Sequence, residues 1–167
     1  MSKKYFESSS LTWWIMGFVV ASIAVLFAIV FYTNKPALFK TNREVALTCT
    51  TDMATQFHIH PVLKVIINGE PQEISGNIGV MSNCMYALHT HDNTGVLHVE
   101  SPEKRDFTLS DFFAVWQKTF NKDQILDFKA DDRHIIREAV NGKETQDYEN
   151  TILRDKDEIV ISYEEKR

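Results

Sequence analysis

The chain has 167 residues, of which 44% are hydrophobic and 25% are charged, and its formal net charge is −5. This balance is typical of a folded globular protein and excludes a disordered chain. Residues 1–33 carry two Lys and one Glu, so the remainder has a formal charge of −6, which argues against nucleic acid or an anionic membrane surface as its partner.

The first predicted element is a membrane-spanning helix at residues 11–32. This run of 22 residues contains no charge, and at 1.5 Å per residue a helix of this length covers the hydrocarbon core of a bilayer. Trp13, Trp14 and Tyr32 lie near its ends, where aromatic rings favour the interface. The run ends in "FYTNKP", whose bulky residues do not suit a signal-peptide cleavage site, so we expect the anchor to be retained.

The sequence decides less about the orientation of this anchor. Basic residues flank it almost equally on both sides, so the positive-inside rule does not separate the two orientations. The short tail at 1–10 and the location of both cysteines beyond the anchor favour a cytoplasmic tail and an extracytoplasmic domain in the plasma membrane. Cys49 and Cys84 either form a disulfide in an oxidising compartment or remain two separate buried thiols.

Residues 33–45 are predicted to be a juxtamembrane linker, and 46–167 a single domain. Apolar residues alternate from Phe57 to Ile67 with an interruption at Pro61, and Asn68-Gly69 then favours a hairpin turn followed by a return strand. A second hairpin is expected around a four-residue turn at 92–95.

A change to helical spacing at Leu109, Phe112, Phe113 and Trp116 predicts a short amphipathic helix. Another hairpin turn is expected at 141–142, before a final strand. The predicted fold is therefore α+β, with one N-terminal transmembrane helix followed by a small mixed domain of β-hairpins and one or two short helices. The ending "LRDKDEIVISY" resembles the last strand of β-grasp modules.

Histidines are concentrated in one part of this domain. Five of the six lie within 41 positions, and we predict that all five lie on strand faces turned away from the core: His58, His60, His89, His91 and His98. Residues i and i+2 of a strand point to the same side, so His58 pairs with His60 and His89 with His91. The sixth, His134, is predicted to be an ordinary strand residue.

The turn at 92–95 sets a register for the second hairpin. Antiparallel partners would then be His89 with His98 and His91 with Val96, and opposed side chains have Cβ atoms about 4.5 to 5.5 Å apart. Three imidazoles would therefore converge on one face of the hairpin, with Tyr86, Leu88, Leu97 and Val99 on the other face. Whether "HIHP" joins them depends on whether its strand lies beside this hairpin.

Such a set of imidazoles suits a copper or zinc ion, and Asp92 and Glu100 are further candidates as ligands or proton-transfer groups. Met81, Met85 and the cysteines are alternative soft ligands that would favour Cu(I). A single His-x-His motif on a strand is more often a solvated face, but the clustering of five histidines favours metal binding.

From Cys49 through Trp116 the chain contains, in order, "HIHPVLKVIINGE", "NIGV", "CMYALHTHDNTGVLHVESP" and "FTLSDFFAVW". These segments resemble an uncharacterised family of small membrane-anchored or secreted proteins of bacteria and archaea. The resemblance implies an exported domain in which Cys49 and Cys84 are bridged beside the histidines. It implies no reaction.

Three functions fit these features. The first is a membrane-anchored, extracytoplasmic copper- or zinc-binding protein that delivers an ion or serves a membrane complex as an accessory subunit. The second is a structural or interaction subunit of such a complex without metal, docking through small residues of its anchor such as Gly17, Ala21 and Ala24. The third is a small metal-dependent enzyme in which Glu100 or Asp92 handles protons; it is less favoured because it requires an open coordination position and a substrate pocket, neither of which the sequence reveals.

Overall fold

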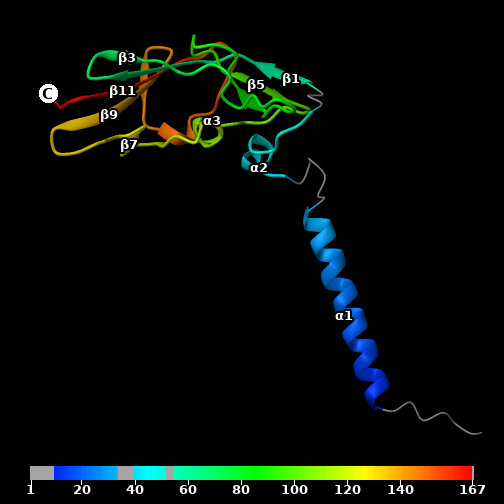
Figure 1. Cartoon of the computed structure of the whole chain (residues 1–167). Helices are drawn as coiled ribbons and strands as arrows, with labels where there is room; N and C mark the ends of the chain where they lie inside the picture. The colour runs from blue at the N-terminus through cyan, green and yellow to red at the C-terminus, as the bar shows by residue number, and fades with distance from the viewer. Residues whose placement is uncertain (1–9, 34–39, 52–54, 167) are drawn as a thin grey trace, which may run out of the picture. The chain divides into compact units, whose positions relative to one another are not determined.

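The computed structural model describes residues 10–33, 40–51 and 55–166 (Figure 1). Two compact units are present, Met1–Lys40 and Thr41–Arg167. Residues 1–9 of the expected tail and 34–39 of the expected linker lie outside the described residues.

The first unit contains one helix, α1 (Ser10–Thr33), which matches the predicted anchor. From Thr12 to Thr33 it is long and apolar enough to cross a membrane, as a transmembrane span or a signal sequence would be. Two of its hydroxyl groups are satisfied within the helix: Ser22 Oγ donates to the Phe18 carbonyl at 2.9 Å, and Thr33 Oγ1 donates to the Ile29 carbonyl at 3.0 Å. Such internal bonds reduce the cost of placing a polar side chain in lipid.

The second unit begins at α2 (Asn42–Ala46), earlier than the expected start at 46. Thr41 and Glu44 form a reciprocal capping box, the arrangement that satisfies free N–H groups at a helix start. Arg43 then joins this helix to the rest of the domain, because its Nε lies 3.1 Å from Oδ1 of Asp111, a nearly buried carboxylate. The end of the predicted linker is therefore part of the folded domain.

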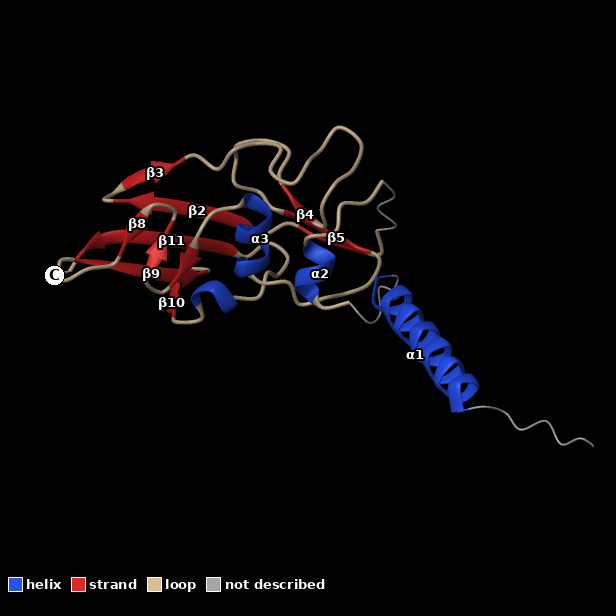
Figure 2. Ribbon diagram, turned by 60° about the horizontal axis from the view of Figure 1, so that its bottom comes forward, coloured by secondary structure: helices blue, strands red, loops and turns tan. Residues whose placement is uncertain are grey.

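The largest sheet has five strands in the order β10-β9-β11-β2-β3. Its strands are β2 (Val62–Ile67), β3 (Glu70–Gln72), β9 (His134–Val140), β10 (Lys143–Thr145) and β11 (Glu158–Glu165). β2 and β11 run parallel at its centre, and the two outer pairs are antiparallel hairpins. A hairpin, a helix, a second hairpin and a last strand parallel to the first make the β-grasp arrangement that the ending of the sequence indicated (Figure 2).

Both predicted Asn-Gly turns are present. Asn68 and Gly69 have φ values of 51° and 87°, and Asn141 and Gly142 have 52° and 77°. Two successive positive φ values match the right-handed twist of hairpin strands, which explains why Asn-Gly is favoured there.

The predicted helix is α3 (Leu109–Trp116), between the two hairpins in the sequence. At its start the Asp111 carboxylate accepts a hydrogen bond from the backbone N–H of Thr108 at 3.0 Å. The Phe112 and Phe113 rings lie at a T-shaped angle and are almost fully buried. They belong to one continuous core with Leu63 and Ile161 of the central strands.

The run predicted as one interrupted strand, 57–67, is divided between two sheets at Pro61. β1 (Phe57–Ile59) joins a three-stranded antiparallel sheet of order β1-β5-β4, with β4 (Leu88–His89) and β5 (His98–Ser101). The segment between β1 and β2 is held by Asp155 Oδ1, which accepts from His60 N at 3.0 Å. This small sheet carries the histidines.

A third sheet contains β6 (Phe120–Asn121), β7 (Gln124–Ile125) and β8 (Phe128–Lys129), and a 3-10 turn, η2, covers Tyr148–Asn150.

Glu138 is an acidic residue in the interior of the large sheet, with only 1% of its surface exposed. Its Oε2 accepts a hydrogen bond from the backbone N–H of Tyr148 at 2.7 Å. Burial raises the pKa of its carboxyl group, despite the opposing effect of the hydrogen bond from Tyr148. The unfolded chain therefore loses its Glu138 proton at a lower pH than the folded protein. As a result, the free energy of unfolding falls as the pH rises through and above the ordinary carboxyl range.

Replacement of Glu138 by Gln should therefore stabilise the protein increasingly as the pH rises from 4 to 8. Urea unfolding of the detergent-solubilised chain over this range measures the difference in unfolding free energy between variant and wild type. Glu144→Gln, at an exposed position of the same hairpin, is the matched control and should show no such gain. A difference for Glu138→Gln that is constant with pH would contradict the assignment.

Candidate metal centre

The β4–β5 pair positions the centre of the histidine cluster. Leu88 pairs with Val99, and His89 pairs with His98, which confirms the predicted register. Because neighbouring residues of a strand point to opposite faces, Leu88 and Val99 enter the core while His89 and His98 share the other face. The expected pairing of His91 with Val96 is not formed, since β4 ends at His89 and Val96 instead bridges Val62.

Thr90 fixes the chain between His89 and His91. It is fully buried, its Oγ1 donates to the Ser75 carbonyl at 2.8 Å, and the same oxygen accepts from Ile78 N at 3.0 Å. The loop before β4 is thereby held against the two histidines on either side of Thr90.

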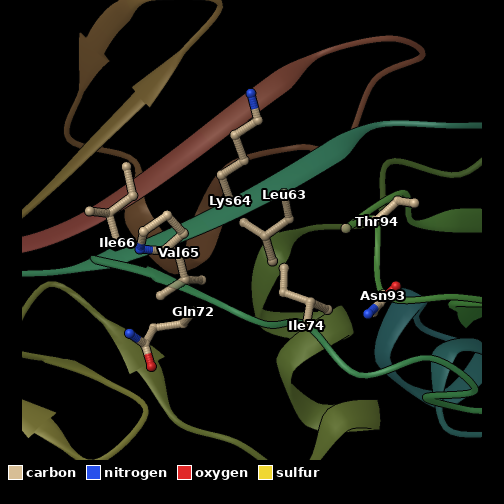
Figure 3. Close-up of a pocket in the computed structure, with 10 residues that line it drawn as sticks. Leu63, Lys64, Val65, Ile66, Gln72, Ile74, Asn93 and Thr94 are labelled. Carbon is tan, nitrogen blue, oxygen red and sulfur yellow. The ribbon is translucent and has the colours of Figure 1, made fainter. Parts of the chain in front are cut away.

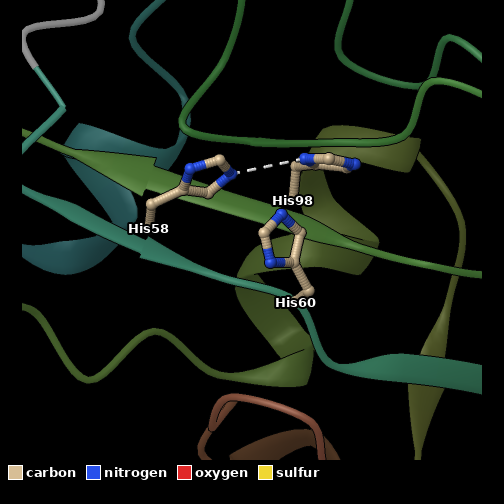
Figure 4. A group of neighbouring side chains, drawn as sticks. All are labelled: His58, His60 and His98. Atoms are coloured by element: carbon tan, nitrogen blue, oxygen red, sulfur yellow. Dashed lines mark hydrogen bonds between the residues drawn. The ribbon is translucent and has the colours of Figure 1, made fainter.

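β1 brings the "HIH" motif to the other side of His98. His58 pairs with Glu100 of β5, so β1 lies directly beside the strand that carries His98. His58 Nε2 lies 3.5 Å from His98 Nδ1, and Figure 4 shows a nitrogen of His60 pointing toward the His98 ring. The strand that contains "HIH" therefore lies beside the histidine hairpin and has the same face turned toward it, so His58 and His60 can join the other three histidines.

The five histidines form two groups of three that share His98. The outer group is His58, His60 and His98, and the inner group is His89, His91 and His98. In each group, one nitrogen from each ring lies within 4.8 Å of the others, close enough to hold a metal ion.

His89 lies on the strand face opposite Leu88, yet it is fully buried. Its strand lies under the loop that precedes β4, because Gly79 packs against it: a Cβ on Gly79 would lie 2.6 Å from the Leu88 carbonyl and 3.3 Å from His89 Cβ. Alternation along one strand does not reveal such a covering loop. The glycine in "NIGV", with φ of 72°, was the available signal.

The tautomer of His89 follows from its hydrogen bond. Nδ1 lies 3.0 Å from the Tyr86 carbonyl, which can only accept, so Nδ1 carries the proton and Nε2 holds a free lone pair. Nε2 is buried and has no hydrogen-bond partner among the described residues. A ring oriented by a backbone carbonyl at one nitrogen, with the other nitrogen free, is the arrangement of metal-ligating histidines.

The cluster favours neutral rings. Burial lowers the pKa of His89. Burial, followed by the nearby imidazoles of His91, His60 and His89, lowers the pKa of His98 to about 4. Neutral imidazole is the form that binds metal, so these two rings need not lose a charge-bearing proton before binding an ion at neutral pH.

The two predicted acidic candidates have different surroundings. Glu100 faces the outer group, with Oε1 3.0 Å from His58 Nε2 and 3.9 Å from His98 Nδ1. Asp92 instead stabilises the turn, because its Oδ1 accepts from the backbone N–H and the hydroxyl of Thr94 at 3.0 and 2.6 Å. These hydrogen bonds lower the pKa of Asp92.

Cys49 and Cys84 form a disulfide, as the family resemblance implied. Bonded to each other, they offer no thiolate to a metal. Met85, next to Cys84, pairs with Thr50 and Val80 through backbone bridges, so the disulfide ties together the segments that lead into β4.

An apolar pocket of about 300 Å³ lies apart from the ligand groups, beside β2 and β3 (Figure 3). Leu63, Val65 and Ile74 contribute to its wall, with Asn93 and Thr94 of the histidine hairpin's turn at one side, and the lining includes none of the five histidines.

Comparisons with known proteins found no matching family model, no matching curated protein and no matching solved structure.

Replacement of Gly79 by Ala tests how the loop covers His89. We expect a loss of unfolding free energy of about 2–4 kcal/mol, because the added Cβ meets the Leu88 carbonyl in addition to the strain of a positive φ. Gly142→Ala is the matched control: its φ is 77°, but nothing lies within 4 Å of the added atom, so about 1 kcal/mol is expected. Equal losses in urea unfolding would show that the close contact is absent.

Proposed function

We propose that this chain is a membrane-anchored, extracytoplasmic protein that binds copper or zinc through its histidine cluster, and that it delivers the ion or serves a membrane complex as an accessory subunit. The observation that carries this proposal is the buried, unpaired Nε2 of His89, beside two further imidazoles.

The buried Nε2 of His89 lowers the stability of the folded protein as long as it has no partner. Burying a polar atom without a hydrogen bond costs about 1–3 kcal/mol. The hydrogen bond from Nδ1 to the Tyr86 carbonyl holds the His89 ring in the orientation that leaves Nε2 unpaired. A metal ion at Nε2 replaces the missing partner. An ordinary solvated strand histidine would have water or a protein group at this position.

The donor set narrows the kind of ion. The inner group consists of three imidazoles, which suit zinc and copper, whereas calcium and magnesium require mostly oxygen ligands. Because Cys49 and Cys84 are bonded to each other, they provide no thiolate ligands, which would favour Cu(I).

The proposed location rests on two observations that are independent of the histidines. The apolar helix α1 is long enough to span a membrane. The disulfide requires an oxidising environment, such as the outer side of the plasma membrane of most organisms, rather than the reducing cytosol.

Metal binding is tested with the full chain in detergent, stripped with a chelator and then loaded with Zn²⁺ or Cu²⁺. Elemental analysis should find stoichiometric metal, and His91→Ala should weaken binding to the inner group at least tenfold because it removes one of that group's ligands at an exposed position. His134→Ala is the matched control, since this ring stacks on Tyr163 outside the cluster and its loss should leave binding unchanged. Absence of bound metal in the wild-type chain, or equal binding by His91→Ala, would refute the proposal.

Orientation is tested in intact cells with a membrane-impermeant maleimide. A cysteine introduced for Lys129, an exposed residue of β8, should be labelled, whereas one introduced for Ser8 in the tail should be labelled only after permeabilisation. The native cysteines should resist alkylation until a reductant is added. The reverse labelling pattern would place the domain in the cytoplasm.

A further inference from the structure

His98 lies between two pairs of histidines. Among the described residues, close ring contacts within the cluster join His58 to His60, join His89 to His91, or join one of these four rings to His98. The centroid distances to His98 are 4.7 Å for His60 and 4.4 Å for His91. The cluster is therefore arranged as two pairs around a common ring.

One nitrogen of that common ring faces the outer pair. Nδ1 of His98 lies on the outer side, 3.5 Å from His58 Nε2. Figure 4 shows the other nitrogen at the opposite end of the ring, directed away from His58. One nitrogen is thus available to the outer group, which leaves Nε2 for the inner group that also includes His98.

The outer group has the donor spacing of a metal site. Two ligand atoms of one tetrahedral zinc ion lie roughly 3.3 Å apart, given metal–ligand bonds of about 2.0–2.1 Å. The measured separations are 3.5 Å between His58 and His98, 3.0 Å between His58 and Glu100, and 3.9 Å between His98 and Glu100. His60 supplies a further donor, so this side offers three nitrogens and one carboxylate oxygen.

We propose that the cluster binds two divalent ions and that His98 bridges them, with Nδ1 on an outer ion held by His58, His60 and Glu100, and Nε2 on an inner ion held by His89 and His91. This inference rests on the proposed metal-binding function. Two ions joined through one imidazole ring lie roughly 6 Å apart, because each is about 2.0–2.1 Å from its nitrogen.

The bridge has a defined proton balance. Neutral His98 carries one N–H proton, which passes to solvent when the second ion binds, so that both nitrogens present lone pairs. The resulting imidazolate and the Glu100 carboxylate supply two negative charges to the two cations. Glu100 therefore acts as a ligand of the outer ion, and its carboxylate beside His58 and His98 balances part of the positive charge of that ion.

Titration of the metal-free full chain in detergent with copper(II) sulfate tests the bridge. We expect two copper ions per chain by elemental analysis. Two Cu²⁺ ions joined by an imidazolate couple antiferromagnetically, so in a frozen solution at low temperature the integrated electron paramagnetic resonance intensity at two equivalents should fall well below that of two independent ions.

Single-site variants provide the matched controls. His60→Ala removes an outer ligand and His91→Ala an inner ligand, so each variant should bind one copper with the full intensity of one spin. His134→Ala should retain two coupled ions. Binding of one ion by the wild type, or of two ions with full spin intensity, would overturn the bridge but not the proposed function. A chain that binds neither copper nor zinc would overturn both.

Discussion

The pairing of His89 with His98 is the constraint on which the candidate metal centre depends. The same two-residue ladder that brings these rings together sends Leu88 and Val99 into the core. A shift of one residue would exchange the two sets, placing imidazoles in the core and aliphatic chains in the cluster. Apolar burial and ligand placement are therefore maintained by one register.

Three features hold that register from outside the short strands. The disulfide ties the segment at Met85 to Thr50, Gly79 allows its loop to lie against Leu88, and the buried Thr90 binds the loop that precedes β4. This support matters because a ladder of two pairs contributes few hydrogen bonds by itself. It also buries His89 and orients its Nε2, the preorganisation that a metal ligand requires.

The histidine sheet is an addition to a β-grasp framework. β4 and β5 lie in the stretch between the first hairpin and α3, and β1 precedes that hairpin. Leu63, Phe112 and Ile161 of the framework belong to one continuous hydrophobic core, to which the small sheet contributes Leu88 and Val99. The candidate ligands His89 and His98 lie on the other face of that small sheet.

The sequence by itself determined the features that depend on neighbouring residues: the apolar run of α1, the Asn-Gly hairpins, helix α3 and the His89–His98 register. Each depends on local turn geometry or residue period. Only the tertiary structure decided that β1 lies beside β5, that a loop buries His89, and that His98 separates two pairs of rings. Such contacts join residues tens of positions apart, and their free energy comes from burial across the whole domain, which no local pattern encodes.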